Sequence, residues 1–255
     1  MCAQTLTNNP STAQQTIDNL LELVYPTRCL GCEKRGVLLC MACASKLMWI
    51  DSATACQRCG APYGKLICTE CYSRTGPEFF NFDAAVCALS FDETVGRLIR
   101  GYKDQGERRV AFLLASCLAA ALPPAWLMWA DALTFIPAQP SAQRKRGFDH
   151  IEQVATLLAP KISLPLLRLL EKAATDDQRN LGREARFQNL AGAFRVKALP
   201  PSLFARSEIR LILIDDVFTT GATLNAAAGA LKLAGASQSP SQKVEIRVAT
   251  VARVW

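Results

Sequence analysis

The stretch from Leu211 to Leu224 reads LILIDDVFTTGATL and decides the fold class. Its opening run of aliphatic residues is typical of a strand in a parallel sheet that is covered on both faces. Two adjacent carboxylates, Asp215 and Asp216, follow at the point where such a strand leaves the sheet. Ligands of open α/β sheets bind at this carboxyl edge, and two like charges are costly there without cationic or hydroxyl partners. The stretch therefore predicts a polar ligand site at the end of a buried strand.

The turn after the two acids has the composition of a phosphate-binding loop. Gly221 allows a tight turn, and a helix is expected to begin near Thr223, with its free N–H groups pointing into the same space. Such a helix N-terminus binds phosphate through its amides and its dipole, and the hydroxyls of Thr219 and Thr220 add donors. A capped helix alone would explain the threonines but not the acid pair. A sugar phosphate explains both, with its ribose hydroxyls or a bound Mg²⁺ at the acids.

Strands and helices alternate through the chain around this stretch. Continuous apolar runs predict strands, and apolar residues spaced by three and four predict helices. The predicted strands cover residues 82–91, 131–138, 208–216 and 243–254, and the predicted helices cover residues 93–105, 107–122, 150–160 and 222–236. This alternation predicts an α/β fold with an open, parallel sheet.

The composition is that of a globular protein with a moderate positive charge. Half of the 255 residues are hydrophobic, which argues against global disorder, and the formal net charge of +7 permits an anionic partner. The N-terminal residues lack the pattern of a secretory signal, and prolines and Asp131 interrupt the most apolar run, residues 110–135. We therefore expect a cytoplasmic protein without membrane insertion, whose cysteines are thiols or metal ligands and not disulfides.

Eight of the eleven cysteines form four C-x-x-C pairs between residues 29 and 71. Two residues between thiolates form a knuckle that aims both sulfurs at one ion, and two knuckles complete a tetrahedral site. Four pairs so close together favour zinc over redox-active dithiols. Because four thiolates leave no open position on the ion, the sequence predicts two structural zinc ions.

The spacing alone leaves the pairing of the knuckles open, because a cross-braced or nested arrangement would mix the two halves. A longer stretch, residues 44–55, separates the second knuckle from the third, so we favour sequential pairing. In that arrangement one ion is bound by Cys29, Cys32, Cys40 and Cys43, and the other by Cys56, Cys59, Cys68 and Cys71.

Together these motifs resemble a known family. The stretch LILIDDVFTTGATL is similar to the phosphoribosyl pyrophosphate signature of type I phosphoribosyltransferases. The four C-x-x-C pairs, RKRGFDH at residues 144–150 and REARFQNLAGAF at residues 183–194 resemble the ComF family, which is linked to natural competence and DNA uptake. The resemblance implies a double zinc ribbon over residues 20–75, followed by a phosphoribosyltransferase-like α/β domain over residues 79–255.

The resemblance also assigns roles to individual residues. Asp215 and Asp216 match the acids that contact the ribose hydroxyls, and they are the expected catalytic residues. Residues 136–148 match the region of the family's pyrophosphate loop. The expected 5-phosphate loop comprises Thr219, Thr220, Gly221, Ala222 and Thr223, and the expected further anion contacts are Arg144, Lys145 and Arg146.

The sequence departs from the family pattern around the pyrophosphate loop. Family members often carry His and Arg near its second proline, where this chain has Gln139, Ser141 and Ala142, and Asp149 replaces a usual Asn. His150, the only histidine, is interpreted as a polar residue at a helix start in preference to a catalytic group. A further segment resembles one that covers the site in related enzymes, and its arginines either close over a phosphate or form a solvated face. These are Arg179, Arg183 and Arg186.

The resemblance implies a protein that binds phosphoribosyl pyrophosphate with Mg²⁺ and transfers the phosphoribosyl group to an acceptor that the sequence does not identify. The transition state of this reaction has oxocarbenium character, so nearby carboxylates can stabilise it. The alternative is a DNA-processing or adaptor protein that binds single-stranded DNA or a helicase partner, with the phosphoribosyl site as a sensor or relic. The net charge allows this alternative, but no dense stripe of basic and aromatic residues favours it.

Overall fold

The structure is a computed structural model, and it describes residues 26–64, 66–73, 80–172, 193–197, 200, 206–238 and 241–255. The chain divides into two compact units, Met1–Lys46 and Leu47–Trp255. This division falls inside the predicted zinc module, between its second and third knuckles. The predicted sequence modules, residues 20–75 and 79–255, remain a prediction.

The first unit holds the first pair of knuckles. Its described residues include a bridge between Arg28 and Arg35 and the short helix α2, Met41–Ala44. The buried residues of its small core are three cysteines, and Leu39 packs against them. A core of this size is too small to fold without a metal ion or another support.

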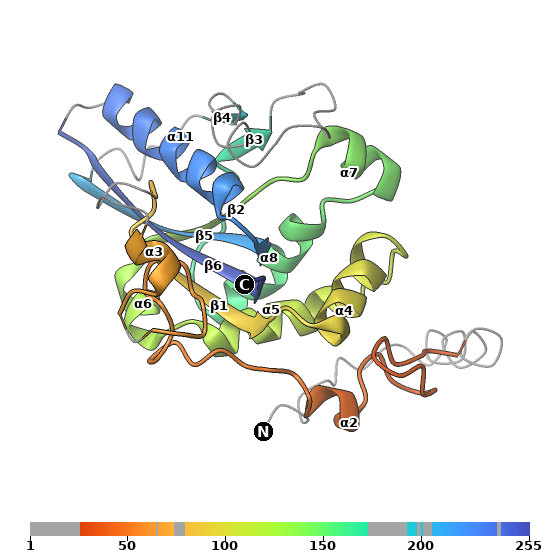
Figure 1. Cartoon of the computed structure of the whole chain (residues 1–255). Coiled ribbons are helices and arrows are strands. Elements are labelled where there is room, and N and C mark those ends of the chain that lie inside the picture. The colour runs from red at the N-terminus through yellow and green to blue at the C-terminus, as the bar shows by residue number, and fades with distance from the viewer. Residues whose placement is uncertain are drawn as a thin grey trace. The chain divides into compact units, whose positions relative to one another are not determined.

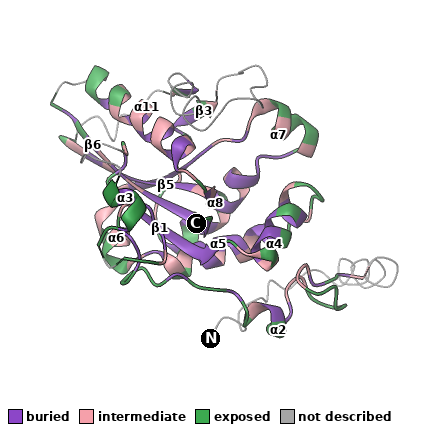
Figure 2. Ribbon diagram, viewed as in Figure 1, coloured by how far each residue is buried: buried purple, intermediate pink, exposed green. Residues whose placement is uncertain are grey.

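The second unit is built on a four-stranded sheet with all neighbouring strands parallel (Figure 1). The strand order is β1–β6–β5–β2, so β5, which carries the acid pair near its carboxyl end, lies inside the sheet. The strands are β1 (Ala84–Ser90), β2 (Ala132–Phe135), β5 (Glu208–Phe218) and β6 (Lys243–Arg253). Most of their residues are buried (Figure 2), which explains the continuous apolar runs.

Helices cover both faces of this sheet. On one face α11 (Ala222–Gln238) packs on β5 and β6, together with the antiparallel pair β3 (Leu170–Lys172) and β4 (Phe194–Val196). The packed helices α5 (Val110–Ala121) and α8 (His150–Lys161) contact the strands from the other face (Figure 1). The other described helices of this unit are α3 (Thr69–Ser73), α4 (Glu93–Lys103), α6 (Pro124–Trp129) and α7 (Pro140–Arg146).

The predicted fold class, a parallel α/β domain preceded by a zinc-ribbon module, is confirmed. Each of the four predicted strands and four predicted helices has a counterpart, although α5 begins only at Val110 and β2 ends at Phe135. The region expected to form a pyrophosphate loop instead contains helix α7. Pro140 occupies the first turn of this helix, where proline favours a helix start, and Gly147 ends it in the left-handed conformation.

The second pair of knuckles belongs to the core of the α/β unit. All four of its cysteines lie in one hydrophobic cluster with residues of β1, β5, β6 and α11. The cysteine Cys87 on β1 is fully buried in the same cluster. The second zinc ribbon is therefore packed on the sheet, on the same face as α11. Among the described residues, no helix has the length and apolar character needed to cross a membrane.

Candidate functional site

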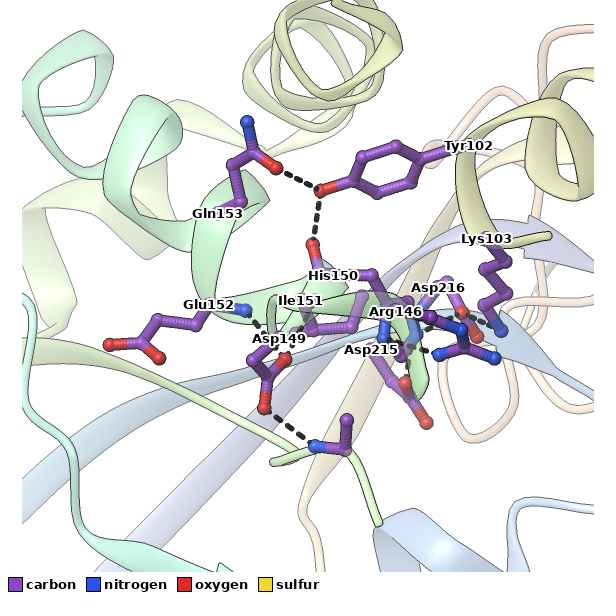
Figure 3. Close-up of polar contacts among 11 residues, drawn as sticks. Tyr102, Lys103, Arg146, Asp149, His150, Ile151, Glu152, Gln153, Asp215 and Asp216 are labelled. Carbon is purple, nitrogen blue, oxygen red and sulfur yellow. Dashed lines mark hydrogen bonds and ion pairs between the residues drawn. The ribbon is translucent and has the colours of Figure 1, made fainter. Parts of the chain in front are cut away.

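The two acids lie at the carboxyl end of β5, and Asp216 is the centre of a buried polar cluster (Figure 3). Its carboxylate is 2.9 Å from Nε2 of His150 and forms an ion pair with the ammonium of Lys103. The side chain of Asp216 is only 9% exposed, so these two partners stabilise a charge that water reaches poorly. Burial alone would raise the pKa of Asp216, but the hydrogen bond to His150 and the Lys103 charge hold it well below its usual range.

Asp215 has the opposite electrostatic character. Its side chain is half-buried, and one carboxylate oxygen accepts a hydrogen bond of 2.9 Å from the backbone N–H of Asp216. Burial, and then the negative charge of Asp216, raise the pKa of Asp215 to about 7. The site therefore combines one carboxylate that is permanently ionised with a second that exchanges a proton near neutral pH, a separation typical of acid–base pairs.

Two helices place the partners of Asp216. Lys103 is the last residue of α4, whose start is capped by Asp92 accepting from the N–H of Val95. His150 is the first residue of α8, and Asp149 caps that helix by accepting from the N–H groups of Ile151 and Glu152. The other carboxylate oxygen of Asp149 accepts a 2.7 Å bond from the N–H of Ala138, which ties the helix start to the segment after β2.

A tyrosine fastens these two helices to each other. The hydroxyl of Tyr102, next to Lys103 on α4, donates to the backbone carbonyl of His150 over 2.6 Å (Figure 3). The tyrosine ring is buried and lies against Phe148. Lys103 and His150 thus approach Asp216 from a rigid support.

Sequence reasoning found one of these partners only in part and missed the other. It placed His150 at a helix start, where the structure also has it, but preferred this role to one in the site. The ion pair of Lys103 with Asp216 was not predicted, because the sequence around a lysine at a helix end carries no sign of a contact with a distant residue. Lys172, at the end of β3, was also missed. Burial lowers its pKa while the charge of Asp215 opposes that shift, so the lysine lies within electrostatic reach of the acids.

The loop after the acids forms the predicted connection from strand to helix. Gly221 has φ +77°, the left-handed conformation that only glycine adopts readily, and α11 begins at the next residue. The hydroxyl of Thr220 accepts from the N–H of Ala222, the first residue of α11, over 3.3 Å. Thr219 is exposed and Thr223 is half-buried. The first turn of α11 thus follows the acid pair after a short loop, as the sequence predicts, and the N–H of Ala222 is already bonded to Thr220.

The three basic residues of α7 separate into two groups. The guanidinium of Arg146 is 3.3 Å from Nδ1 of His150, and it therefore joins the cluster around Asp216 (Figure 3). Arg144 and Lys145 are exposed, and in the described part of the chain no contact joins them to the acids. The predicted roles of Arg179, Arg183 and Arg186, and most of the stretch that contains them, fall on residues 173–192, outside the described residues.

The eight knuckle thiols gather into two groups of four, in the sequential arrangement that the spacing favoured. Within each group all sulfur atoms lie within 4.8 Å of one another. The Sγ atoms of Cys32 and Cys40 are 3.6 Å apart, and so are those of Cys59 and Cys68. A tetrahedron with Zn–S bonds of ~2.3 Å has edges of about 3.8 Å, so both groups fit a four-thiolate zinc site.

The two groups also share a supporting hydrogen bond. The N–H of Cys40 donates to the sulfur of Cys29, and the N–H of Cys68 donates to the sulfur of Cys56, each over 3.3 Å. Hydrogen bonds from N–H groups stabilise thiolates, the form that binds zinc. When bound, the two ions would cross-link the knuckles, and neither site leaves an open coordination position for a substrate.

We expect the raised pKa of Asp215 to give the protein a pH-dependent stability. Between about pH 4, the ordinary pKa of an aspartate, and about pH 7, the folded chain keeps a proton that the unfolded chain releases. The free energy of unfolding therefore falls as the pH rises through this window. The lowered pKa of Asp216 acts in the opposite direction, but only below about pH 4.

The variant Asp215→Asn removes this dependence. Its melting temperature should exceed that of the wild type by a few degrees at pH 8, since ~1 kcal/mol shifts a domain of this size by about 2–4 °C. The advantage should shrink or vanish at pH 5, and thermal melts of both proteins at the two pH values measure it. An advantage that is equal at the two pH values would contradict the assignment.

Comparisons with known proteins agree with this architecture. Residues 20–72 match the family model described as the double zinc ribbon domain. Competence protein F of Haemophilus influenzae is 28% identical over 225 residues, which cover 83% of this chain and 93% of that protein. DNA utilization protein YhgH of Salmonella typhi is 25% identical over 214 residues, which cover 79% of this chain and 89% of that protein.

Among solved structures, orotate phosphoribosyltransferase from Aeropyrum pernix aligns with 64% of this chain and 79% of its own, at 18% identity and a TM-score of 0.29. A similarity this weak bears neither on the ligand nor on the reaction. The zinc-ribbon match and the two relatives, each covered over most of its length, support the assignment of this chain to the ComF family.

Proposed function

We propose that this protein binds phosphoribosyl pyrophosphate with Mg²⁺ at the carboxyl end of β5 and transfers its phosphoribosyl group to an acceptor. The observation that carries the proposal is the direct succession of two electrostatically distinct carboxylates, a left-handed glycine and a helix N-terminus. This succession supports the proposal, because carboxylates suit ribose hydroxyls and a helix N-terminus suits a phosphate. The acceptor remains to be identified.

Each part of the ligand has a candidate partner. The 5-phosphate lies on the amides and hydroxyls of residues 219–223, and the ribose hydroxyls lie on Asp215 and Asp216. Arg146 is the basic residue of α7 that already contacts the cluster, through His150, and it supports the pyrophosphate end. Carboxylate oxygens are ligands that Mg²⁺ accepts, and the ion would neutralise charge on the pyrophosphate.

The same residues support the chemistry of transfer. The bond between the anomeric carbon and the pyrophosphate oxygen breaks, pyrophosphate leaves with the electron pair, and the acceptor forms the new bond. Positive charge develops on the ribose in the transition state, and an ionised Asp216 held in place by His150 can stabilise it. The similarity to proteins named for competence and DNA utilization supports a role connected with DNA uptake.

Calorimetry with phosphoribosyl pyrophosphate and Mg²⁺ tests the proposal. We expect one ligand per chain, with weaker binding of ribose 5-phosphate and of pyrophosphate, which each occupy part of the site. We also expect affinity to rise between pH 6 and pH 8, because Asp215 loses its proton in this range. Absence of binding by the zinc-loaded, folded protein would overturn the proposed function.

The exposed basic residues of α7 favour a second candidate function, binding of single-stranded DNA. Arg144 and Lys145 face solvent, as phosphate contacts must, and a relative is named for DNA utilization. We expect a fluorescent oligonucleotide to bind with an affinity that falls steeply between 50 and 200 mM salt, as counterion release requires at ~6–10 phosphate contacts. Replacing Arg144, Lys145 and Arg146 together by glutamine should weaken binding and flatten the salt dependence. Binding that is insensitive to salt would exclude this role for α7.

A further inference from the structure

A buried arginine connects the second zinc site to the candidate phosphate loop. Arg253, the last residue of β6, is only 4% exposed. Its Nε donates to the carbonyl of Cys59 over 3.0 Å, and its Nη1 donates to the carbonyl of Thr219 over 2.9 Å. Cys59 belongs to the second zinc site and Thr219 opens the loop, so one guanidinium spans both.

This arginine has partners that are unusual for a buried charge. Its Nη1 also contacts the carbonyls of Phe218, over 3.3 Å, and Val254, and its guanidinium lies 4.6 Å from the centre of the Phe218 ring. Within the described part of the chain its hydrogen-bond partners are backbone carbonyls, and no carboxylate pairs with it. A buried cation that is held by carbonyls and one aromatic ring, without a carboxylate, is costly unless each of those carbonyls is kept in position. The buried guanidinium is therefore stable only while the Cys59 carbonyl and the loop carbonyls of Phe218 and Thr219 keep their positions.

The zinc end is held firmly against the sheet. Gly60, directly after Cys59, has φ +67°, and a Cβ atom there would lie 2.5 Å from the sulfur of Cys87 on β1. The Cys87 sulfur in turn accepts from the hydroxyl of Thr250 on β6 over 3.1 Å. A knuckle that approaches the strands this closely has one position in which its carbonyl meets Arg253. The ion that the four thiols fit would fix that position by holding the Cys59 sulfur.

The loop end controls how the chain leaves β5. The carbonyls of Phe218 and Thr219 directly precede the residues expected to hold the phosphate, and the Phe218 carbonyl also accepts from the N–H of Val254 over 2.9 Å. Because each carbonyl shares a peptide plane with the next N–H, holding the Phe218 and Thr219 carbonyls also sets the direction of the N–H groups of Thr219 and Thr220. Those amides must point at one spot if they are to bind an anion, because anion binding by a loop depends on preorganised donors.

We propose that Arg253 is a positioning residue that makes the second zinc site part of the ligand loop. Zinc at Cys56, Cys59, Cys68 and Cys71 holds the Cys59 carbonyl, Arg253 transmits that order to Thr219, and the loop amides are preorganised as a result. Loss of this zinc releases the Cys59 carbonyl, so the guanidinium loses one acceptor. It then shifts toward the loop carbonyls, and the loop changes its conformation. The affinity part of the inference rests on the proposed function, whereas the order of the loop does not.

The chain contains its own control for a zinc effect. The first site has the same four-thiolate chemistry and the same N–H to sulfur bond, but it belongs to the other compact unit. Cys40→Ser and Cys68→Ser therefore remove equivalent ligands, the third cysteine of each site. Only the second substitution removes a ligand from the zinc site whose Cys59 carbonyl bonds to Arg253.

Hydrogen exchange of the ligand-free full chain, with metal analysis on the same samples, tests the inference. In Cys68→Ser we expect the hydrogen-bonded amides at the loop, those of Ala222, Asn225 and Val254, to exchange about ten- to hundredfold faster than in the wild type, the effect of losing a charge-assisted hydrogen bond. In Cys40→Ser they should be unchanged, although each variant loses one zinc ion. The amides of β5 report whether the sheet itself stays folded.

A variant of the arginine keeps the inference testable if Cys68→Ser does not fold. Arg253→Met should retain two zinc ions per chain and yet show the same faster exchange in the loop. The exchange rate in Arg253→Lys should lie between those of the wild type and Arg253→Met. If wild-type protein does not bind phosphoribosyl pyrophosphate but the loop still responds to the second zinc, the proposed function fails and this inference stands. Loop exchange that is the same in Arg253→Met, or that responds equally to both zinc sites, would overturn it.

Discussion

Replacement of Gly221 by valine is expected to abolish binding of phosphoribosyl pyrophosphate to the loop after β5. The glycine has φ +77°, which is strained for a β-branched residue. A Cβ atom at this position would also lie 2.7 Å from Cζ of Phe218 and 3.0 Å from Cε1 of Phe80. Both rings belong to an aromatic group packed beneath the loop, so they have little room to move.

The loop must therefore shift, and its amides lose their common direction. Each charge-assisted hydrogen bond to a phosphate contributes ~1.5–3 kcal/mol, so loss of two or more lowers the affinity by at least about a hundredfold. From the sequence alone the expected clash is with the phosphate itself. The structure identifies an earlier one, between the new side chain and the aromatic rings that support the loop.

Thermal stabilisation by phosphoribosyl pyrophosphate with Mg²⁺ measures this effect, with Gly106→Val as the matched control. Gly106 also has a left-handed φ, +72°, but a Cβ atom there meets nothing within 4 Å. Both variants force a β-branched residue into a left-handed backbone conformation, and only Gly221→Val adds the clash with the aromatic rings. We expect ligand-induced stabilisation to persist in the control and to disappear in Gly221→Val. Equal stabilisation of the two variants would place the ligand elsewhere.

The sequence was sufficient to predict those features that depend on neighbouring residues in the chain. The aliphatic run predicts β5, although the strand continues two residues past the acid pair, to Phe218, and the Gly221 turn predicts the start of α11. The C-x-x-C pairs predict the two thiol groups, because a knuckle is defined by a spacing of three residues. Local geometry of this kind needs no knowledge of the rest of the fold.

The features that depend on distant contacts could not be predicted. Lys103 and Asp216 are separated by more than a hundred residues, and so are Cys59 and Arg253. A lysine at a helix end and an arginine in a final strand look like ordinary surface residues, since only the folded topology brings them to a buried partner. The same reason explains why the second zinc ribbon, read as part of a separate module, packs into the core of the α/β unit.

Asp216→Asn illustrates how such a contact changes an expectation about stability. Seen in the sequence, the substitution removes one of two adjacent like charges, and the relief of repulsion should offset any lost hydrogen bond. In the structure Asp216 pairs with Lys103 and His150 instead. We now expect Asp216→Asn to destabilise the protein by ~1–3 kcal/mol, because it leaves the lysine, whose side chain is only 24% exposed, without its partner.

A double-mutant cycle separates this pair from the rest of the cluster. Lys103→Met keeps the aliphatic stem of the lysine but removes its charge, so it leaves Asp216 with His150 as its remaining polar side-chain partner among the contacts described here. The double variant, Asp216→Asn with Lys103→Met, replaces the ion pair by neutral groups and should be more stable than the sum of the two single changes predicts. Urea unfolding of the four proteins gives the coupling energy, which we expect to be ~1–2 kcal/mol for a pair in contact. Strictly additive single effects would mean that Lys103 does not hold Asp216, and the acid would then owe its ionised state to His150 alone.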